Sequence, residues 1–449
     1  MKERIVKLDI TAVTPEGHGV AREDGGKVVF VPDTAPGDIV TAGIIKELKN
    51  SSVARLISVG LPSPSRVAPD CEVCTKCGGC VFRHIDYKAE AEIKKGFVAE
   101  AFKRIAGKEI AVGDTVAGDP DFYRNKVQYP FAPGKNGECA FGYYARRSHR
   151  IIRYADCRLQ DGIFHRIASA CAELAGLYGV KAYDETAGKG VLRHIVMRKS
   201  PKGKVLVCLV VSKEDKAAER IALALPERFP EVAGVHINVN PRRDNVIFGD
   251  GTYRVCGSDT LEMALCGRTF ALSPGSFFQV NTAMAEKLYN YAAGLIAPLA
   301  PETVLDLYCG VGSVGICVAP ESAKLFGVEI NPQAVENAKK NAALNGRSEN
   351  DSRFICGDAS LGVAECEKTF GSPDVIIVDP PRKGLEKAVI DTVVSASPKA
   401  VVYISCDPAT LARDCAIFAE SGYKFDFAQP FDLFPRTGHV ETVVLLSRK

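Results

Sequence analysis

Apolar and polar positions alternate along the first 60 residues, with the period of β-strands. Turn signals rich in glycine, proline and aspartate separate these short runs, at residues 17–19, 24–26, 32–33 and 36–38. Several short strands at such close spacing predict a small OB-like β-barrel over residues 1–60. Two prolines, Pro62 and Pro64, then favour an extended linker.

From about residue 300 onward, apolar strand-like runs alternate with helical stretches. The strand-like runs cover residues 303–307, 325–329, 354–356, 375–378, 401–404 and 440–446. This alternation predicts βαβ units and a mostly parallel sheet. We therefore expect a Rossmann-like α/β domain over residues 291–449.

The stretch between these two regions, residues 61–290, has a mixed pattern and is expected to form a central α/β domain. Strand-like runs occur at residues 204–211 and 234–240. Apolar positions recur at helical spacing over about 87–105, which predicts an amphipathic helix. A length of 449 residues agrees with three domains of about 150 residues each.

Composition excludes some classes of protein. Hydrophobic residues make up 46% and charged residues 25%, and no run reaches the ~18 apolar residues of a membrane span. The N-terminus has the charged, alternating pattern of a strand and not that of a signal peptide, and 16 cysteines suit a reducing compartment. We expect a soluble cytoplasmic protein without a membrane partner. A net charge of +3 is too small to indicate nucleic-acid binding by itself.

The predicted strand ends of the C-terminal region carry glycines and acids. These residues are Gly310, Gly312, Gly315, Glu329, Asp358 and Asp379. In a doubly wound sheet a ligand binds beyond the carboxyl ends of the strands, so they are expected to surround a nucleoside cofactor. Glycines alone would suit NAD equally well. However, Asp379-Pro380-Pro381 resembles the Asp/Asn-Pro-Pro signature of methyltransferases that act on nucleic-acid bases, which favours S-adenosylmethionine.

Cys406 follows the apolar run 400–404 and precedes a helix start at Asp407-Pro408. Uracil C5 is a poor nucleophile, but a thiolate that adds to C6 turns C5 into an enolate carbon able to accept a methyl group. Cys406 is therefore the predicted nucleophile, which the helix N-terminus would assist. The alternative is a buried, inert cysteine.

The same chemistry needs a base that removes the C5 proton. Glu441 enters an otherwise apolar strand, where burial would raise its pKa towards neutrality. We predict it as the base. A surface acid on an edge strand is the alternative interpretation, and His439 is a rival base.

Four cysteines lie within ten residues, at Cys71, Cys74, Cys77 and Cys80. Such a cluster indicates a metal site more than core packing. An all-sulfur zinc site is one interpretation, and the repeated two-residue spacing also suits ferredoxin-type iron–sulfur ligation. The spacing leaves both open.

Taken together, several motifs resemble the RNA uracil-5-methyltransferase family, more narrowly its ribosomal-RNA branch with a TRAM domain and a [4Fe-4S] cluster. They are Cys71-x5-Cys77-Gly78-Gly79-Cys80, Tyr123-Arg124-Asn125-Lys126, Arg193-His194-Ile195, residues 273–281 and 305–312, Asp379-Pro380-Pro381-Arg382 and Ser405-Cys406-Asp407-Pro408. They span the chain in the order of the family.

The resemblance implies that Cys71, Cys77, Cys80 and Cys157 ligate the cluster, which leaves Cys74 outside the family spacing and the choice between Cys74 and Cys157 open. It also implies a set of cofactor contacts: Gln279, Tyr308, Ser313, Glu329, Asp358 and Asp379. Cys406 and Glu441 keep their roles as nucleophile and base.

The activity implied by the resemblance is methylation of C5 of a uridine in RNA, with 23S rRNA as the expected partner of a monomeric enzyme. The barrel and the cluster-bearing domain would bind RNA, with phosphate contacts from Arg146, Arg147 and Arg150. A transfer-RNA uridine methyltransferase is the first alternative. A non-catalytic RNA-binding iron–sulfur protein is the second, and the presence of both Cys406 and Glu441 disfavours it.

Overall fold

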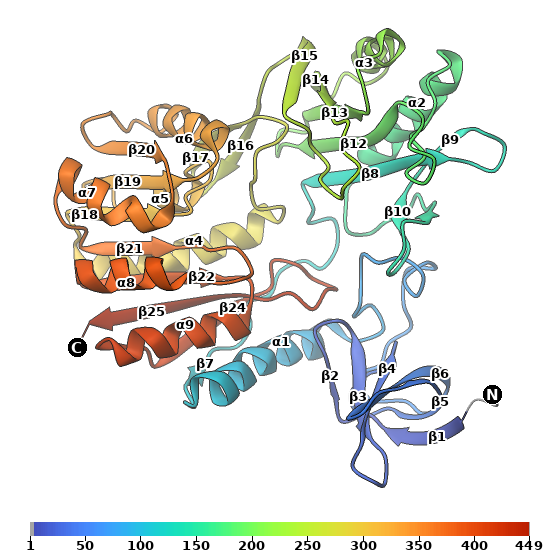
Figure 1. Ribbon diagram of the computed structural model, residues 1–449, viewed down its shortest axis with the longest axis horizontal. Helices are drawn as coiled ribbons and strands as arrows, with labels where there is room; N and C mark the ends of the chain where they lie inside the picture. Colours follow the sequence, from blue (N-terminus) through green and yellow to red (C-terminus); the bar gives the residue numbers. More distant parts are fainter. Residues whose placement is uncertain (1–3, 449) are drawn as a thin grey trace.

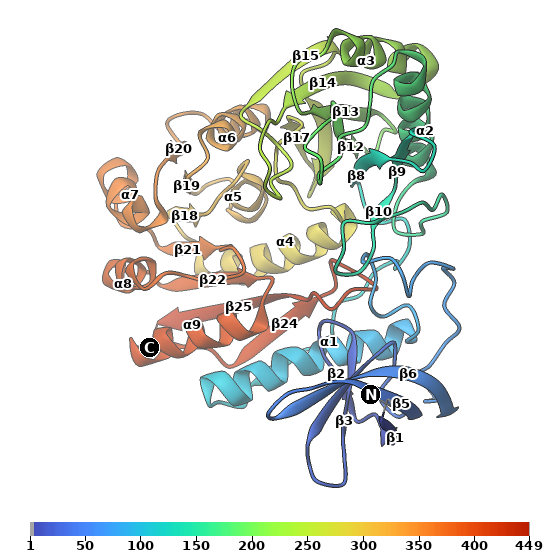
Figure 2. The same cartoon turned by 45° about the vertical axis from the view of Figure 1, so that its right-hand side comes forward.

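The computed structural model describes residues 4–448, which form three large sheets together with two short hairpins (Figure 1). An N-terminal sheet and a central sheet have six strands each, and a C-terminal sheet has nine. The N-terminal and central sheets lie at opposite ends of one side of the molecule, and the nine-stranded sheet lies beside them (Figure 2).

The N-terminal sheet has the strand order β1-β5-β6-β4-β3-β2 and curls around a small core. Its strands are β1 (Arg4–Asp9), β2 (Ala12–Val13), β3 (His18–Arg22), β4 (Val28–Pro32), β5 (Ile39–Glu47) and β6 (Ser51–Leu61). Alternate side chains such as Leu8, Val29 and Val40 fill the core. The alternation of apolar and polar residues in the sequence therefore corresponds to side chains that point into the core and away from it.

This barrel-like unit packs tightly on two other parts of the chain. A Cβ atom added to Gly17 would lie 2.6 Å from Cβ of Val81, and one added to Gly438 would lie 1.8 Å from the carbonyl oxygen of Pro15. Only residues without side chains allow such approaches. The turn around residues 14–17 is thus docked against two parts of the chain. One is residues 71–81, here called the cysteine-bearing segment, and the other is the loop that precedes the last strand.

Helix α1 (Tyr87–Ala101) follows the cysteine-bearing segment and ends in a π-helical turn, η1 (Phe102–Ala106). The side chain of Asp86 caps its start by accepting hydrogen bonds from the amides of Lys88 and Ala89. Val98 and Phe102 are buried in the core of the C-terminal sheet. Strand β7 (Ala111–Val112) then joins the edge of that sheet beside β24.

The central sheet has the order β15-β14-β13-β12-β8-β9. Its strands are β8 (Lys126–Pro133), β9 (Cys139–Phe141), β12 (Leu192–Lys199), β13 (Val205–Val211), β14 (Val232–Val239) and β15 (Gly251–Gly257). Helices α2 (Gly162–Leu177) and α3 (Lys216–Arg228) cover one face and share its core. A small hairpin, β10 (Tyr143–Tyr144) and β11 (Ile151–Ile152), extends towards the cysteines.

The C-terminal sheet has the order β20-β19-β18-β21-β22-β25-β24-β7, with β23 paired to β25. Its further strands are β18 (Thr303–Leu307), β19 (Lys324–Glu329), β20 (Ser352–Cys356), β21 (Val375–Val378), β22 (Ala400–Ser405), β23 (Tyr423–Lys424), β24 (Phe427–Phe431) and β25 (Glu441–Arg448). The strands from β20 to β22 are parallel, and β25 runs antiparallel to β22. The chain order reverses at β18, between β19 and β21, which is where a ligand site is expected.

Helices cover both faces of this sheet. One face packs on α4 (Thr282–Ile296), α5 (Ser313–Val318), α6 (Pro332–Leu344) and the hairpin β16–β17 (Leu261–Leu265 and Arg268–Leu272). The other face packs on α1, α7 (Gly362–Phe370), α8 (Lys387–Ala396) and α9 (Pro408–Glu420). The hairpin and α4 precede residue 291 but share the core of the C-terminal sheet.

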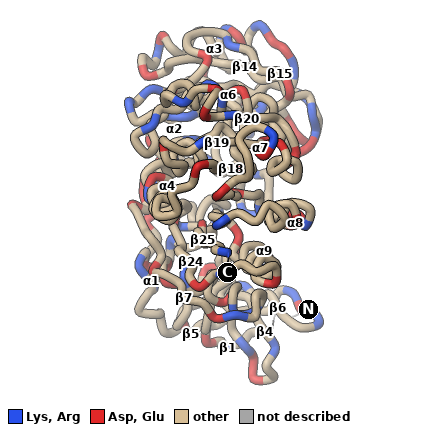
Figure 3. Tube along the Cα trace, turned by 90° about the vertical axis from the view of Figure 1, so that its left-hand side faces the viewer, with Lys and Arg blue, Asp and Glu red and all other residues tan. Residues whose placement is uncertain are grey.

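Lysines and arginines alternate with acidic residues over the whole trace (Figure 3), in keeping with the net charge of +3. Among the described residues, no helix has the length and apolar character needed to cross a membrane.

Candidate active site

Cys406 stands where β22 ends and α9 begins. The carboxylate of Asp407 caps α9 by accepting hydrogen bonds from the amides of Ala409 (2.9 Å) and Thr410 (3.0 Å). The Cys406 side chain is partly exposed, so it is open to a substrate. The end of the strand and the start of the helix together hold the thiol at the carboxyl edge of the sheet.

The register of β22 and β25 brings Glu441 beside this cysteine. The strands are antiparallel, and their last pair is Ser405 with Thr442. The next residues outward are Cys406 and Glu441, and Glu441 is close enough to Cys406 to raise the pKa of its thiol. Glu441 is 5% exposed and begins β25, where it also pairs with Phe431 of β24. Two residues that are 35 positions apart in sequence thus become direct neighbours across the sheet.

The electrostatics of this pair follow from burial and from neighbouring charges. Burial raises the pKa of Glu441 to about 8, with a further increase from Asp379 that the Arg382 guanidinium opposes. Burial, Glu441 and Asp379 raise the pKa of Cys406 to about 12. The raised pKa of Glu441 has the expected direction. Asp407 engages the amides of Ala409 and Thr410 and also raises the pKa of Cys406, which works against the expected assistance from the helix N-terminus.

His439, the rival base, is held by Arg382. The Arg382 guanidinium donates a hydrogen bond to Nε2 of His439 at 3.1 Å. Burial, and then the charge of Arg382, lower the pKa of His439. The ring nitrogen that faces Arg382 is therefore already engaged as an acceptor, which makes Glu441 the better candidate for the base.

The turn after β18 supplies the cofactor side of the site. Tyr308 and Gly310 both adopt positive φ angles, of 66° and 56°. The amide of Gly310 donates to Oε2 of Glu329 at 3.1 Å, so the acid at the end of β19 holds the turn. No atom lies within 4 Å of a Cβ placed on Gly310, which leaves open space beside this backbone. A backbone of this kind lets a ligand approach closely.

Gln279 and Ser313 reach the same edge from other elements. Both are buried, and both lie close to the hydroxyl of Tyr289 on α4. Tyr289 also lies near Asp379, whose pKa burial raises to about 7. Asp379 and Ser313 thus belong to one cluster with Gln279, next to Cys406 and Glu441.

Asp358 lies at the outer end of the predicted set. It is exposed and caps η3 (Ala359–Leu361) by accepting a hydrogen bond from the amide of Ser360. It is close enough to Tyr308 to raise the pKa of the phenol, after the larger effect of burial. Asp358 therefore borders the turn from the solvent side and does not join the buried cluster.

Two residues that shape this site, Asn125 and Asp306, were named above only as parts of longer motifs, without a role of their own. Asn125 holds the 273–281 loop, because its side chain donates to the carbonyl oxygen of Gln279 at 2.9 Å. Asp306, in the middle of β18, accepts a hydrogen bond from the amide of Gly315 at 2.8 Å and fixes the start of α5. A buried acid inside the apolar run 303–307 was a signal that could have found Asp306. The role of Asn125 depends on tertiary contacts that no local pattern encodes.

The predicted metal ligands line one cavity. Its walls include the five cysteines under consideration: Cys71, Cys74, Cys77, Cys80 and Cys157. Burial raises the pKa of Cys80 to about 11, and it also raises the pKa of Cys77. Within residues 4–448, no group of three or more histidine, cysteine or acidic side chains has an arrangement that could hold a metal ion. The structure therefore brings the cysteines together without showing a metal centre.

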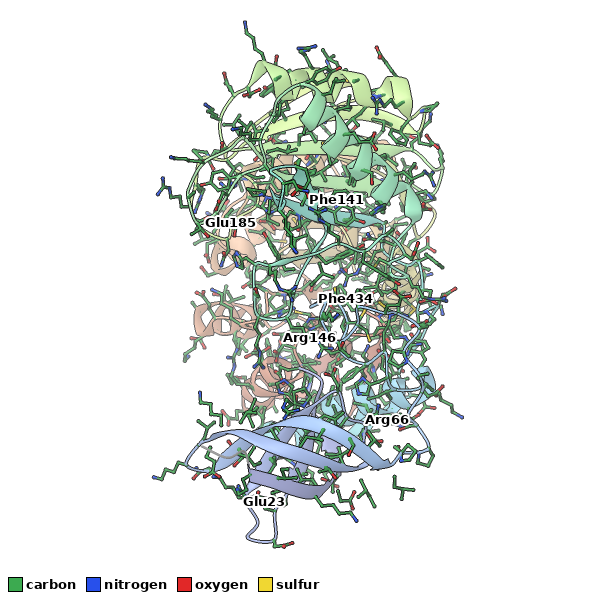
Figure 4. The ribbon with its side chains drawn as sticks, turned by 90° about the vertical axis from the view of Figure 1, so that its right-hand side faces the viewer. Glu23, Arg66, Phe141, Arg146, Glu185 and Phe434 are labelled. Carbon is green, nitrogen blue, oxygen red and sulfur yellow. The ribbon has the colours of Figure 1, made fainter. Side chains whose placement is uncertain are left out.

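Arg146 joins the barrel to the cysteine-bearing segment (Figure 4). Its guanidinium donates to Oδ1 of Asp33 and to the carbonyl oxygen of Cys74, both at 2.8 Å, and to the more distant carbonyl of Cys77. Arg147 lies 3.3 Å from Nε2 of His18. Protein groups therefore engage part of the Arg146 guanidinium, and its contact with RNA phosphates stays a prediction.

These features define a class of protein, the S-adenosylmethionine-dependent RNA methyltransferases, and comparison with known proteins gives the family. A family model described as tRNA (Uracil-5-)-methyltransferase matches residues 200–353 and 367–449, and a TRAM domain model matches residues 1–57. The chain belongs to the RNA uracil-5-methyltransferase family, and its N-terminal unit is a TRAM domain.

Relatives extend over the whole chain. An uncharacterized RNA methyltransferase of Listeria innocua is 38% identical, and the match covers 100% of this chain and 98% of the relative. One from Staphylococcus aureus is 36% identical over 100% of both chains. Among solved structures, Pyrococcus abyssi tRNA (uracil-54, C5)-methyltransferase in complex with S-adenosyl-L-homocysteine has a TM-score of 0.77 and 25% identity, covering 98% of this chain and 99% of that one.

Proposed function

We propose that this chain methylates C5 of a uridine in RNA through a covalent bond between Cys406 and C6 of the base. One observation carries the proposal. The register of β22 and β25 places the thiol of Cys406 opposite the buried carboxyl group of Glu441, beside Asp379 at the carboxyl edge of the sheet. A nucleophile and a base that face each other beside a cofactor turn are what this reaction requires.

Each residue has one task in the reaction. The Cys406 thiolate adds to C6, and the ring electrons that this addition places on C5 would attack the methyl group, whose bond to the sulfonium sulfur would break with release of S-adenosyl-L-homocysteine. S-adenosylmethionine, when bound, supplies that methyl group and a positive charge that favours the thiolate. Glu441 then accepts the proton from C5, and the bond between sulfur and C6 breaks, which restores the aromatic ring and the thiolate.

The cofactor is assigned to the turn after β18 and its surroundings. The residues proposed to bind it are Gln279, Tyr308, Ser313, Glu329, Asp358 and Asp379. What supports this assignment is that Tyr308, Glu329, Asp358 and Asp379 end or follow strands around β18, with open space beside Gly310. Ser313 begins α5, and Gln279 lies close to the same Tyr289 hydroxyl as Ser313.

The RNA target is proposed to be 23S rRNA, because the cysteine cluster and the TRAM domain resemble the ribosomal branch of the family. The solved relative from Pyrococcus abyssi is named for uracil 54 of tRNA, so a tRNA uridine is the alternative. Deletion of the gene should remove 5-methyluridine from one or more positions of 23S rRNA, measured by mass spectrometry of digested RNA. Loss from tRNA alone would decide for the alternative, and no loss from either RNA would favour a non-catalytic binding protein.

We propose further that Cys71, Cys77, Cys80 and Cys157 hold a [4Fe-4S] cluster with a structural role, with zinc as the alternative. What supports this proposal is the chemistry of the lining, since five cysteines line one cavity together with Arg83 and Arg124. Two guanidinium groups would offset the negative charge of thiolate ligands. The cluster would support the RNA-binding surface and take no part in the reaction.

Protein purified without oxygen should be brown and carry about four irons per chain, measured by metal analysis and absorbance. Cys157→Ala should lower the iron content strongly, whereas Cys74→Ala should leave it unchanged and so serves as the matched control. The reverse result would make Cys74 the fourth ligand. A colourless protein that contains zinc would contradict the cluster.

A further inference from the structure

The loop of residues 432–440 links β24 to β25 and leads directly into Glu441. Contacts from distant parts of the chain hold it. The hydroxyl of Tyr123 donates to the carbonyl oxygen of Pro435 at 3.1 Å. The amide of Val81 donates to the carbonyl oxygen of Arg436 at 2.8 Å. Pro15 of the TRAM domain also approaches this loop at Gly438, so the TRAM domain, the cysteine-bearing segment and the central region all meet at the loop that precedes the proposed base.

The strongest of these contacts is a buried charge cluster centred on Lys94 of α1. The Lys94 ammonium group lies 2.8 Å from Oε1 of Glu90 and 2.8 Å from Oδ1 of Asp432, and it donates to the carbonyl oxygen of Phe434 at 3.2 Å. The side chains of Lys94, Glu90 and Asp432 have no exposed surface. A lysine from one helix thus binds the loop at two positions.

Glu90 adds a third point of attachment. Its Oε1 accepts a hydrogen bond from the amide of Arg436 at 2.7 Å, and the Arg436 guanidinium lies 3.5 Å from its Oε2. That guanidinium also donates to the carbonyl oxygen of Ile85 at 3.0 Å. One turn of α1 therefore holds the loop at residues 432, 434 and 436.

Buried ion pairs of this kind are poor sources of stability, since the cost of removing charges from water offsets most of their attraction. What they impose is geometry, because each charged group has few positions in which its partners satisfy it. A loop pinned in this way has one conformation. Its end, Glu441, must point its carboxyl group at a single proton on a bound ring.

We propose that Lys94 is a positioning residue for the base: by holding the 432–440 loop it sets the place of Glu441, and so it controls the step in which the C5 proton leaves. The inference rests on the proposed function. Cys406 is held separately, by β22 and by the cap of α9, so formation of the covalent bond does not depend on Lys94.

Lys94→Met tests the inference, with Lys95→Met as the matched control. Lys95 is the next residue of the same helix, and its side chain is partly exposed and pairs with the exposed Asp114 at 2.8 Å. Lys94→Met should lower kcat for methyl transfer about 10- to 100-fold, as expected for a small displacement of a catalytic group. The KM for RNA should stay within about threefold, and covalent protein–RNA adduct should accumulate on denaturing gels.

Asp432→Asn gives the same test from the side of the loop and keeps the shape of the side chain, so it serves if Lys94→Met does not fold. Two folded variants with the kcat of Lys95→Met would overturn the inference. Loss of activity without accumulated adduct would overturn it as well, since that result points to a merely structural role.

Hydrogen exchange separates this inference from the proposed function. In protein without RNA, the amides of residues 432–440 should exchange faster in Lys94→Met and Asp432→Asn than in Lys95→Met. Unchanged exchange in both variants would contradict the inference whatever the reaction. If the wild-type protein methylates no uridine but the loop loses protection as expected, the proposed function fails and the role of Lys94 in holding the loop remains.

Discussion

Cys406→Ala is expected to abolish methyl transfer, with a loss of at least about four orders of magnitude, because no other group can activate C5 of the ring. Binding of S-adenosylmethionine should be unchanged, since the residues assigned to the cofactor lie on other strand ends. The measurements are transfer of labelled methyl groups to RNA and calorimetric titration with the cofactor. The variant should also form no covalent adduct with RNA.

Cys256→Ala is a suitable control for this experiment. Cys256 is half-buried on β15 of the central sheet, far along the chain from β22 and β25, and its sulfur lies 3.8 Å from the carbonyl oxygen of Ala222. This variant should keep full activity. Full activity in Cys406→Ala would eliminate the nucleophile assignment and with it the proposed mechanism.

Glu441→Gln is expected to trap the reaction halfway. The amide has the shape of the carboxyl group but cannot accept the C5 proton, so the methylated ring should stay bound to Cys406. Glutamine also cannot carry the negative charge with which an ionised Glu441 raises the pKa of the thiol, so the first step should not slow. A covalent protein–RNA species that persists on a denaturing gel, with product formation lowered about 100-fold or more, is the expected result.

The dependence of the wild-type rate on pH gives a second measurement of the same group. The pKa of Glu441 is raised to about 8, and the base must be deprotonated to work. Below pH 8 the carboxyl group is mostly protonated, so kcat/KM should rise as the pH approaches about 8. At higher pH, ionisation of Glu441 should give no further increase in kcat/KM. Turnover at a normal rate by Glu441→Gln, combined with loss of activity in His439→Ala, would assign the base to His439 instead.

Much of the C-terminal fold could be predicted from sequence because its strands are short, apolar runs bounded by clear turn signals. The predicted runs 303–307 and 375–378 coincide with β18 and β21, and the predicted strand at 440–446 is β25. The antiparallel direction of β25 could not be predicted, since direction depends on sheet pairing and not on local pattern. Yet that direction is what sets Glu441 against Cys406.

The electrostatic state of the site was predicted only in part. Burial of Glu441 could be expected from an acid in an apolar strand, and its raised pKa follows. For Cys406 the sequence suggests activation by a helix, whereas the structure shows that Asp407 caps the helix and that two carboxyl groups surround the thiol. The two acids are Asp379, which follows β21, and Glu441, which begins β25. Pairing between strands that are distant in sequence brings them near Cys406, so no local motif predicts their combined effect on the pKa of the thiol.

The close approach of Pro15 to Gly438 has a consequence for the design of new specificity. Exchange of the N-terminal unit for one from another protein would change more than the recognised nucleic acid, because a bulkier graft at this point would press on the segment that carries the base. A successful chimera would have to retain the small turn of residues 14–17 and its seat against Val81. The N-terminal unit and β25 should therefore be exchanged together when a chimera is designed.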